Sequence, residues 1–281
     1  MPYCSHCGIQ LTEGASFCHV CGASVTSVSG RSTHQTFNVN GVPRVVISSR
    51  SPGSIEISRS NKESEIEADV ILKEESYLEW NITQNGDVIA GICRPKMGVL
   101  EFPGGFSLQG ARADFILKVP KQTILDLTNR FGEITVRGVE GPSISAESSV
   151  GSIRISDFEG TANVRTKTGL LSLENLKGRV SARNSAGSIT YSGSLSLGDS
   201  SFSTKVGNIE ITLGGDLNLK IDASSRVGRV TVDPSIKEAQ FQSEQYGIGN
   251  RIYCTIGTGA LRLFSETLTG TISIQHSTLQ K

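Results

Sequence analysis

Gly151-Ser152-Ile153-Arg154-Ile155 is the stretch of sequence that decides the fold. A glycine is followed by two apolar residues at alternate positions, with a polar residue between them. The same phrase begins at Gly53, Gly132, Gly169, Gly187, Gly207, Gly228, Gly259 and Gly270. From Gly132 to Gly228 the successive spacings are 19, 18, 18, 20 and 21 residues, and a period near 20 is typical of stacked repeats.

A second apolar pair lies between successive glycine phrases, for example Ile144 and Ala146. Each repeat therefore predicts two short strands, and stacking identical turns would place equivalent strands in parallel, about 4.8 Å apart. Two inward columns follow from this register. The first contains Ile134, Ile153, Leu171, Ile189, Ile209 and Val230, and the second contains Val136, Ile155, Leu173, Tyr191, Ile211 and Val232.

The predicted fold is mainly β, a parallel β-solenoid with two short strands in each turn of about 18–21 residues. The alternative is an antiparallel β-sandwich, which gives similar alternation but no reason for a constant repeat length. No segment longer than ten residues has a helical period, so almost no helix is expected. The irregular spacing of the last repeats predicts that they close one end of the stack.

The first 23 residues contain two copies of a metal-binding knuckle. Cys4 and Cys7 form the first pair, Cys18 and Cys21 form the second, and a glycine follows each pair. Four thiolates complete the closed tetrahedral shell of structural zinc. Iron would use the same ligands, and two disulfides would require an oxidising compartment. This ribbon has no Lys or Arg, so protein docking suits it better than nucleic-acid binding.

The chain divides into three predicted segments. Residues 1–23 form the zinc ribbon, and residues 24–36, rich in Ser and Thr, read as a flexible linker. Residues 37–281 form the β body, with a less regular β region over 37–120 and the repeat ladder over 121–281. A loop is expected from Arg94 to Gly110, where prolines and glycines interrupt the strand pattern.

The composition of the chain restricts its expected cellular location and the classes of partner that it could bind. Lys plus Arg and Asp plus Glu are both 27, so a neutral body gives no strong case for nucleic acid or an anionic membrane as the main partner. No apolar run is long enough for a membrane span, and no secretory signal is recognised. A reducing cytoplasm is therefore expected, with the cell surface as the alternative. Cys93 and Cys254 stand alone, and we expect them to be small buried residues.

Two family resemblances extend this interpretation. Residues 3–23 resemble the short zinc-ribbon modules at the N-termini of many bacterial proteins. The stretch from Ile116 to Lys121, followed by Leu125 to Val136 and the glycine phrases, is similar to a bacterial adhesin-like β-solenoid domain of unknown function. The resemblance implies the solenoid fold over residues 37–281, and it carries no catalytic residues.

The outward positions of the phrases give no sign of chemistry. They are mixed in size and charge: Thr135, Arg154, Ser172, Thr190, Glu210, Thr231, Arg262 and Ser273. A solvated face explains this row better than a ligand ladder does. No triad, phosphate loop or histidine pair is visible, so we predict no catalytic residues and no enzyme activity.

The leading functional hypothesis is a non-enzymatic scaffold or protein-binding protein, in which the ribbon docks partners and the body is rigid. The alternatives are a surface adhesin exported by an unrecognised route and a carbohydrate-active β-helix enzyme. A specific site is expected where the repetition fails: in Arg94–Gly110, in Pro234–Thr258 or in the ribbon.

Overall fold

The protein is built almost entirely from β-strands. The computed structural model describes residues 31–96, 110–233, 240–246 and 248–277. Within these ranges the chain forms 22 strands, which hydrogen bonds join into one sheet of mixed orientation. The helical structure in the same ranges is a single 3-10 turn, η1, at Glu75–Tyr77. The prediction of a mainly β protein is confirmed.

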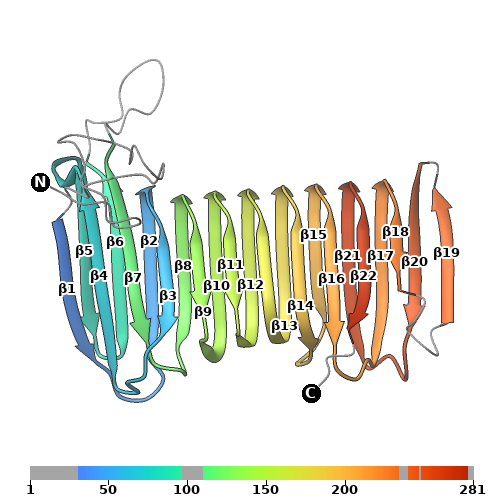
Figure 1. Cartoon of the computed structure of the whole chain (residues 1–281), viewed down its shortest axis with the longest axis horizontal. Coiled ribbons are helices and arrows are strands. Elements are labelled where there is room, and N and C mark those ends of the chain that lie inside the picture. The colour runs from blue at the N-terminus through green and yellow to red at the C-terminus, as the bar shows by residue number, and fades with distance from the viewer. Residues whose placement is uncertain (1–30, 97–109, 234–239, 247, 278–281) are drawn as a thin grey trace, which may run out of the picture.

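The strands lie in two rows along the length of the molecule (Figure 1). Row A contains, in spatial order, β5 (Leu78–Asn85), β6 (Val88–Pro95), β2 (Arg44–Pro52), β8 (Ile124–Phe131), β10 (Glu140–Val150), β12 (Glu159–Thr168), the second half of β13 (Leu171–Ala186), β15 (Ser200–Val206), β21 (Leu261–Thr269), β17 (Leu219–Val227), β20 (Gly249–Thr255) and β19 (Gln240–Tyr246).

Row B follows the same axis. It contains β1 (Arg31–Asn38), β4 (Glu65–Lys73), β7 (Arg112–Val119), β3 (Ile55–Arg59), β9 (Ile134–Arg137), β11 (Ile153–Ser156), the beginning of β13, β14 (Ile189–Leu195), β16 (Ile209–Gly214), β22 (Ile272–Ser277) and β18 (Val230–Val232). β13 belongs to both rows, because its beginning pairs with β11 and its second half pairs with β12.

The central strands pair in parallel and with a constant register. In row B, Ile153 of β11 lies beside Ile134 of β9 on one side and Leu171 of β13 on the other. In row A, Ala146 of β10 lies between Leu127 and Val164 in the same way. Antiparallel neighbours, which the β-sandwich alternative requires, occur only at the two ends of the described rows.

The predicted inward columns form the core between the rows. Residues of the first column, from Ile134 to Val230, are at most 3% exposed. The second column is buried from Val136 to Ile211, and its last member, Val232, is half-buried. Burial of these alternating side chains is the main stabilising contribution. The side-chain predictions for the core are therefore confirmed.

A column of buried polar side chains holds together the corners between the rows. At seven corners, the residue three positions before the corner glycine donates a hydrogen bond of 2.8–3.5 Å to the carbonyl oxygen of the glycine in the neighbouring turn. The donors are Asn129, Ser148, Thr166, Asn184, Thr204, Thr267 and Ser225, and all are buried. Each bond satisfies a carbonyl group at the corner, which would be costly to leave without a donor.

The last turn is placed out of sequence order, which we did not predict. β21 pairs with both β15 and β17, and β22 pairs with both β16 and β18. Residues 261–277 therefore insert between two earlier turns instead of closing the stack. The insertion is possible because the Gly270 corner has the same geometry as the others. The phrase at Gly259 does not form a corner between the rows. Its residues Arg262 and Leu263 belong to β21 of row A, where Leu263 is buried and Arg262 faces outward. Arg262 therefore does not belong to the outward face of row B.

Antiparallel strands cover both ends of the stack. At the N-terminal end, β5 pairs with β6, β4 pairs with β7 and β1 pairs with β4; at the other end, β20 pairs with β17 and β19 pairs with β20. The predicted linker needs correction, because residues 31–36 belong to β1. Pairing with β4, including a 2.8 Å contact between His34 Nδ1 and Asp69 Oδ1, orders them.

The two isolated cysteines are buried, as expected. Cys93 is 1% exposed and Cys254 is 2% exposed. Burial raises the pKa of both thiols, and a hydrogen bond with Ser51 partly offsets the rise at Cys93. Neither thiol is suited to act as a nucleophile. No helix in the described ranges has the length and apolarity that a membrane span requires.

Candidate functional site

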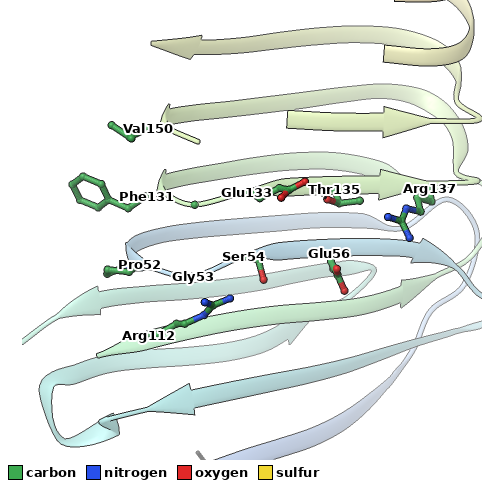
Figure 2. Close-up of a pocket in the computed structure, with 11 residues that line it drawn as sticks. Pro52, Gly53, Ser54, Glu56, Arg112, Phe131, Glu133, Thr135, Arg137 and Val150 are labelled. Atoms are coloured by element: carbon green, nitrogen blue, oxygen red, sulfur yellow. Dashed lines mark hydrogen bonds between the residues drawn. The ribbon is translucent and has the colours of Figure 1, made fainter. Parts of the chain in front are cut away.

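A groove of about 700 Å³ lies on the outer face of row B, across β3 and β9 (Figure 2). Alternation along these strands places the apolar residues Ile55 and Ile134 in the core and their polar neighbours in the groove. The polar side chains that line it are Ser54, Glu56, Arg112, Glu133, Thr135 and Arg137. Pro52, Phe131 and Val150 form an apolar rim at the corners where the chain passes from row A into row B.

Ion pairs hold two sides of the groove in place. Glu133 forms an ion pair with Arg154 and accepts a 3.3 Å hydrogen bond from Thr135 Oγ1. Asp114 accepts bonds from Arg112 Nε at 2.7 Å and from the Ser54 hydroxyl at 2.7 Å. The bond to Asp114 raises the pKa of the Arg112 guanidinium, which stays charged.

Glu56 and Arg137 are the charged groups that the groove leaves available. Both are exposed, and neither makes a hydrogen bond or ion pair with another residue in the described part of the chain. A carboxylate and a guanidinium on one surface, beside an apolar rim, can bind a ligand that has both polar and apolar parts. The groove contains no histidine or cysteine, and Glu133 is already engaged. Glu56 and Arg137 make the groove a candidate binding surface.

A second polar surface lies at the C-terminal end of row A. Arg251 of β20 makes two hydrogen bonds, of 2.8 and 2.6 Å, to Asp222 of β17. Its guanidinium also lies 4.5 Å from the centre of the Tyr253 ring. Phe264 of β21 pairs with Asp222 from the other side and is 41% exposed. Two of these residues, Arg251 and Tyr253, come from the irregular range Pro234–Thr258 that the sequence singled out.

The predicted site residues fall into two groups. Cys4, Cys7, Cys18 and Cys21 lie outside the described residues, as do residues 97–109 of the predicted loop. The predicted outward row of β9, β11, β13, β14 and β16 lies in register. Its mixed side chains form no metal site: no cluster of three His, Cys, Asp or Glu residues exists in the described ranges.

Sequence reasoning missed the groove because its residues belong to separate turns. Glu56 and Thr135 are 79 positions apart in the chain but are paired in β3 and β9. The signal that could have found it is the shared phrase at Gly53 and Gly132. Aligning those two phrases places Glu56 beside Thr135 and Ser54 beside Glu133.

Solved structures of several bacterial proteins are similar to this chain. A "putative cell adhesion protein" from Clostridium sporogenes is 14% identical and has a TM-score of 0.43, covering 88% of this chain and 100% of its own. A "putative adhesin" from Bacteroides fragilis is 10% identical, with a TM-score of 0.42 and coverage of 87% and 97%. A "putative lipid binding protein" from Parabacteroides distasonis is 12% identical, with a TM-score of 0.26 and coverage of 89% and 96%.

Family matches cover both parts of the sequence. No curated protein matches it. Residues 3–25 match the zinc-ribbon domain family, and this range includes all four predicted metal ligands. Residues 121–275, more than half of the chain, match the family described as Toastrack DUF4097. The chain therefore belongs to the Toastrack DUF4097 family.

Proposed function

We propose that this chain is a non-enzymatic binding protein, in which a zinc ribbon docks a protein partner and a rigid β-solenoid presents a second binding surface. Cys4, Cys7, Cys18 and Cys21 would hold the zinc as four thiolates, with no open position for catalysis. The zinc-ribbon family match over residues 3–25 supports this part of the proposal. Zinc would stabilise the ribbon, which is too small to build a core of its own.

The solenoid interpretation accounts for the register of the body. Strands of equivalent repeats pair in parallel through the central turns, with corner glycines stacked on corner glycines. A stack of this kind is rigid, because hydrogen bonds hold each turn to its two neighbours. Such a body suits a protein that holds binding surfaces at fixed distances.

The proposed binding role rests on two exposed, charged side chains in the groove, Glu56 and Arg137. The surrounding charges of the groove are neutralised by neighbours on the same face, whereas these two have no partner in the described ranges. A ligand that pairs with both would gain two charge-assisted hydrogen bonds. No acid–base or nucleophilic set accompanies them, so binding is favoured over carbohydrate hydrolysis.

The compartment that fits this proposal is the cytoplasm. Reduced thiolates are required for the metal site, and a reducing environment preserves them. An exported surface adhesin is the alternative. Fractionation of cells separates the two, because recovery on the cell surface would overturn the cytoplasmic assignment.

A quantitative pull-down tests the two surfaces separately. Four chains are compared: the natural chain, Cys4→Ser/Cys7→Ser, Glu56→Gln/Arg137→Gln and, as a control, Glu210→Gln/Arg262→Gln. We expect the cysteine variant to lose one group of partners and the groove variant to lose another, while the control retains both. Equal recovery by all four chains would contradict the proposal. Turnover of a polysaccharide by the natural chain, lost in Glu56→Gln, would revive the enzymatic alternative.

A further inference from the structure

The corners that lead from row A to row B line up along one edge of the molecule. We define the glycine edge as the two residues before and the one residue after each of seven corner glycines: Gly132, Gly151, Gly169, Gly187, Gly207, Gly270 and Gly228. Adjacent corners are in register, since Val150 pairs with Phe131 and Thr168, and Ala186 pairs with Val206. At about 4.8 Å per strand, the edge is straight and roughly 29 Å long.

Cations recur on every second strand of this edge. Arg130 of β8, Lys167 of β12, Lys205 of β15 and Arg226 of β17 occupy equivalent positions, two residues before their glycines, and all are exposed. The strands between them, β10, β13 and β21, carry Ser149, Ser185 and Leu268 at that position. The cations are thus about 9.6 Å apart, twice the strand spacing.

The glycine edge has a strong excess of positive charge. Arg229 adds a fifth cation, and Glu133, which is paired with Arg154, is the one carboxylate. Within the described ranges, Lys167, Lys205 and Arg226 make no ion pair. Their charges are therefore available to a partner with negative charge.

An apolar row runs directly beside the cations. Of the seven residues immediately before the glycines, two are threonines and five are apolar; among the apolar ones, Val150 is 49% exposed, Val206 is 56% exposed and Val227 is 39% exposed. Phe131 extends the row, and the guanidinium of Arg130 lies 5.3 Å from the centre of its ring. Leu170, just after Gly169, is 52% exposed. Such a line of exposed apolar side chains is typical of an interaction surface.

The opposite edge has the opposite charge. The corners that lead from row B back to row A, at residues 120–123, 137–140, 156–159, 174–177, 196–199 and 214–218, contain six carboxylates and three cations. They are Glu140, Asp157, Glu159, Glu174, Asp199, Asp216, Lys121, Arg137 and Lys177. The overall neutrality of the chain therefore hides a separation of charge between two parallel edges. An anionic surface would attract the glycine edge and repel the acidic edge.

We propose that the glycine edge docks on an anionic lipid surface, with the cations among the phosphate groups and the apolar row inserted at the level of the headgroups. A straight edge matches a flat surface along its whole length. Cations next to exposed aliphatic side chains are the composition of interfacial membrane-binding segments. A nucleic acid or another soluble polyanion would use the cations alone and would leave Val150 and Val206 without a role.

Flotation with lipid vesicles tests this proposal. The full chain is mixed with vesicles of pure phosphatidylcholine or of phosphatidylcholine with 30% phosphatidylglycerol. We expect binding to the second type only, with release as salt is raised. Lys167→Ser/Lys205→Ser, which introduces the residue found at Ser149 and Ser185, should weaken binding about 30-fold, because each cation near an anionic surface contributes roughly a factor of five.

Two matched variants separate the competing explanations. Lys121→Ser/Lys177→Ser removes the same charge from the acidic edge and should bind as the natural chain does. Val150→Ser/Val206→Ser keeps every cation and should weaken vesicle binding about tenfold. Equal binding to both types of vesicle, or equal losses in both lysine variants, would overturn the proposal. Full binding by the valine variant would also overturn it, because the cations would then serve a soluble polyanion.

Discussion

Replacing one corner glycine with alanine should break the stack at a known place. Gly151 has φ = +149°, and a Cβ atom built on it would lie 1.9 Å from the carbonyl oxygen of Gly132 in the neighbouring turn. Contacts below 3.0 Å are essentially absent from real structures, so the two turns must separate by about 1 Å, the difference between these distances.

The cost follows from the bonds at this corner. Between these two turns, Gly132 N donates to Val150 O at 2.9 Å, Ile134 N donates to Ser152 O at 3.0 Å, and Ser148 Oγ donates to Gly132 O at 3.5 Å. Loss of two or three such bonds costs about 1 kcal/mol each, and the positive φ adds roughly 1–2 kcal/mol for alanine. We expect Gly151→Ala to lower the free energy of unfolding by about 3–5 kcal/mol.

Gly198→Ala is the matched control. Gly198 also has a positive φ, +114°, but a Cβ atom there would meet nothing within 4 Å. It should therefore cost only the conformational part, about 1–2 kcal/mol. Urea denaturation followed by far-ultraviolet circular dichroism measures both changes. A Gly151→Ala chain that is no less stable than Gly198→Ala would refute the stacked-corner reasoning.

Three further changes test other parts of the structure. Thr166→Val removes the donor to the carbonyl of Gly151 and should cost about 1–3 kcal/mol in urea denaturation, whereas the exposed Thr128→Val should be nearly neutral. Burial raises the pKa of the Tyr191 hydroxyl above the free tyrosine value of about 10, so the folded chain keeps this proton at a pH where the unfolded chain loses it. The associated stability is present below about pH 10 and is lost as pH rises. Tyr191→Phe should therefore make the fall in urea midpoint between pH 8 and pH 11 shallower, and an unchanged slope would count against this role. Chelation, or Cys4→Ser/Cys7→Ser, should remove the zinc measured by atomic absorption and leave the unfolding midpoint of the body unchanged; a large fall in that midpoint would show that ribbon and body are not separate modules.

The repeat phrase was enough to predict the columns of the core. Ile153 and Ile155 alternate with Arg154, and a shared glycine aligns them with the next turn, so local pattern and register agree. The place of the last turn could not be predicted in this way. The Gly270 phrase is equivalent to its neighbours, and only the pairing of β21 with both β15 and β17, and of β22 with both β16 and β18, shows that it was inserted.

The charge separation was hidden for a related reason. Lys167 and Lys205 lie 38 residues apart in the sequence, and a sum over the chain gives zero net charge. Once the register is known, both fall in one column, whereas Glu159 and Asp199 fall on the other edge. Residues 31–36 were assigned to a linker because Ser and Thr dominate them; the partner strand β4, which orders them, cannot be recognised from composition.

Cross-linking across the inserted turn tests the central claim, that equivalent residues of successive turns lie beside one another in the observed order. Ser203 of β15 pairs with Glu266 of β21, which in turn pairs with Ser224 of β17. A disulfide needs Cα atoms within about 7 Å, so Ser203→Cys/Glu266→Cys should cross-link, whereas Ser203→Cys/Ser224→Cys, two strand spacings or about 9.6 Å apart, should not. Mass spectrometry of the digested, oxidised chain distinguishes the linked peptides. A link between positions 203 and 224, with none between 203 and 266, would contradict the account.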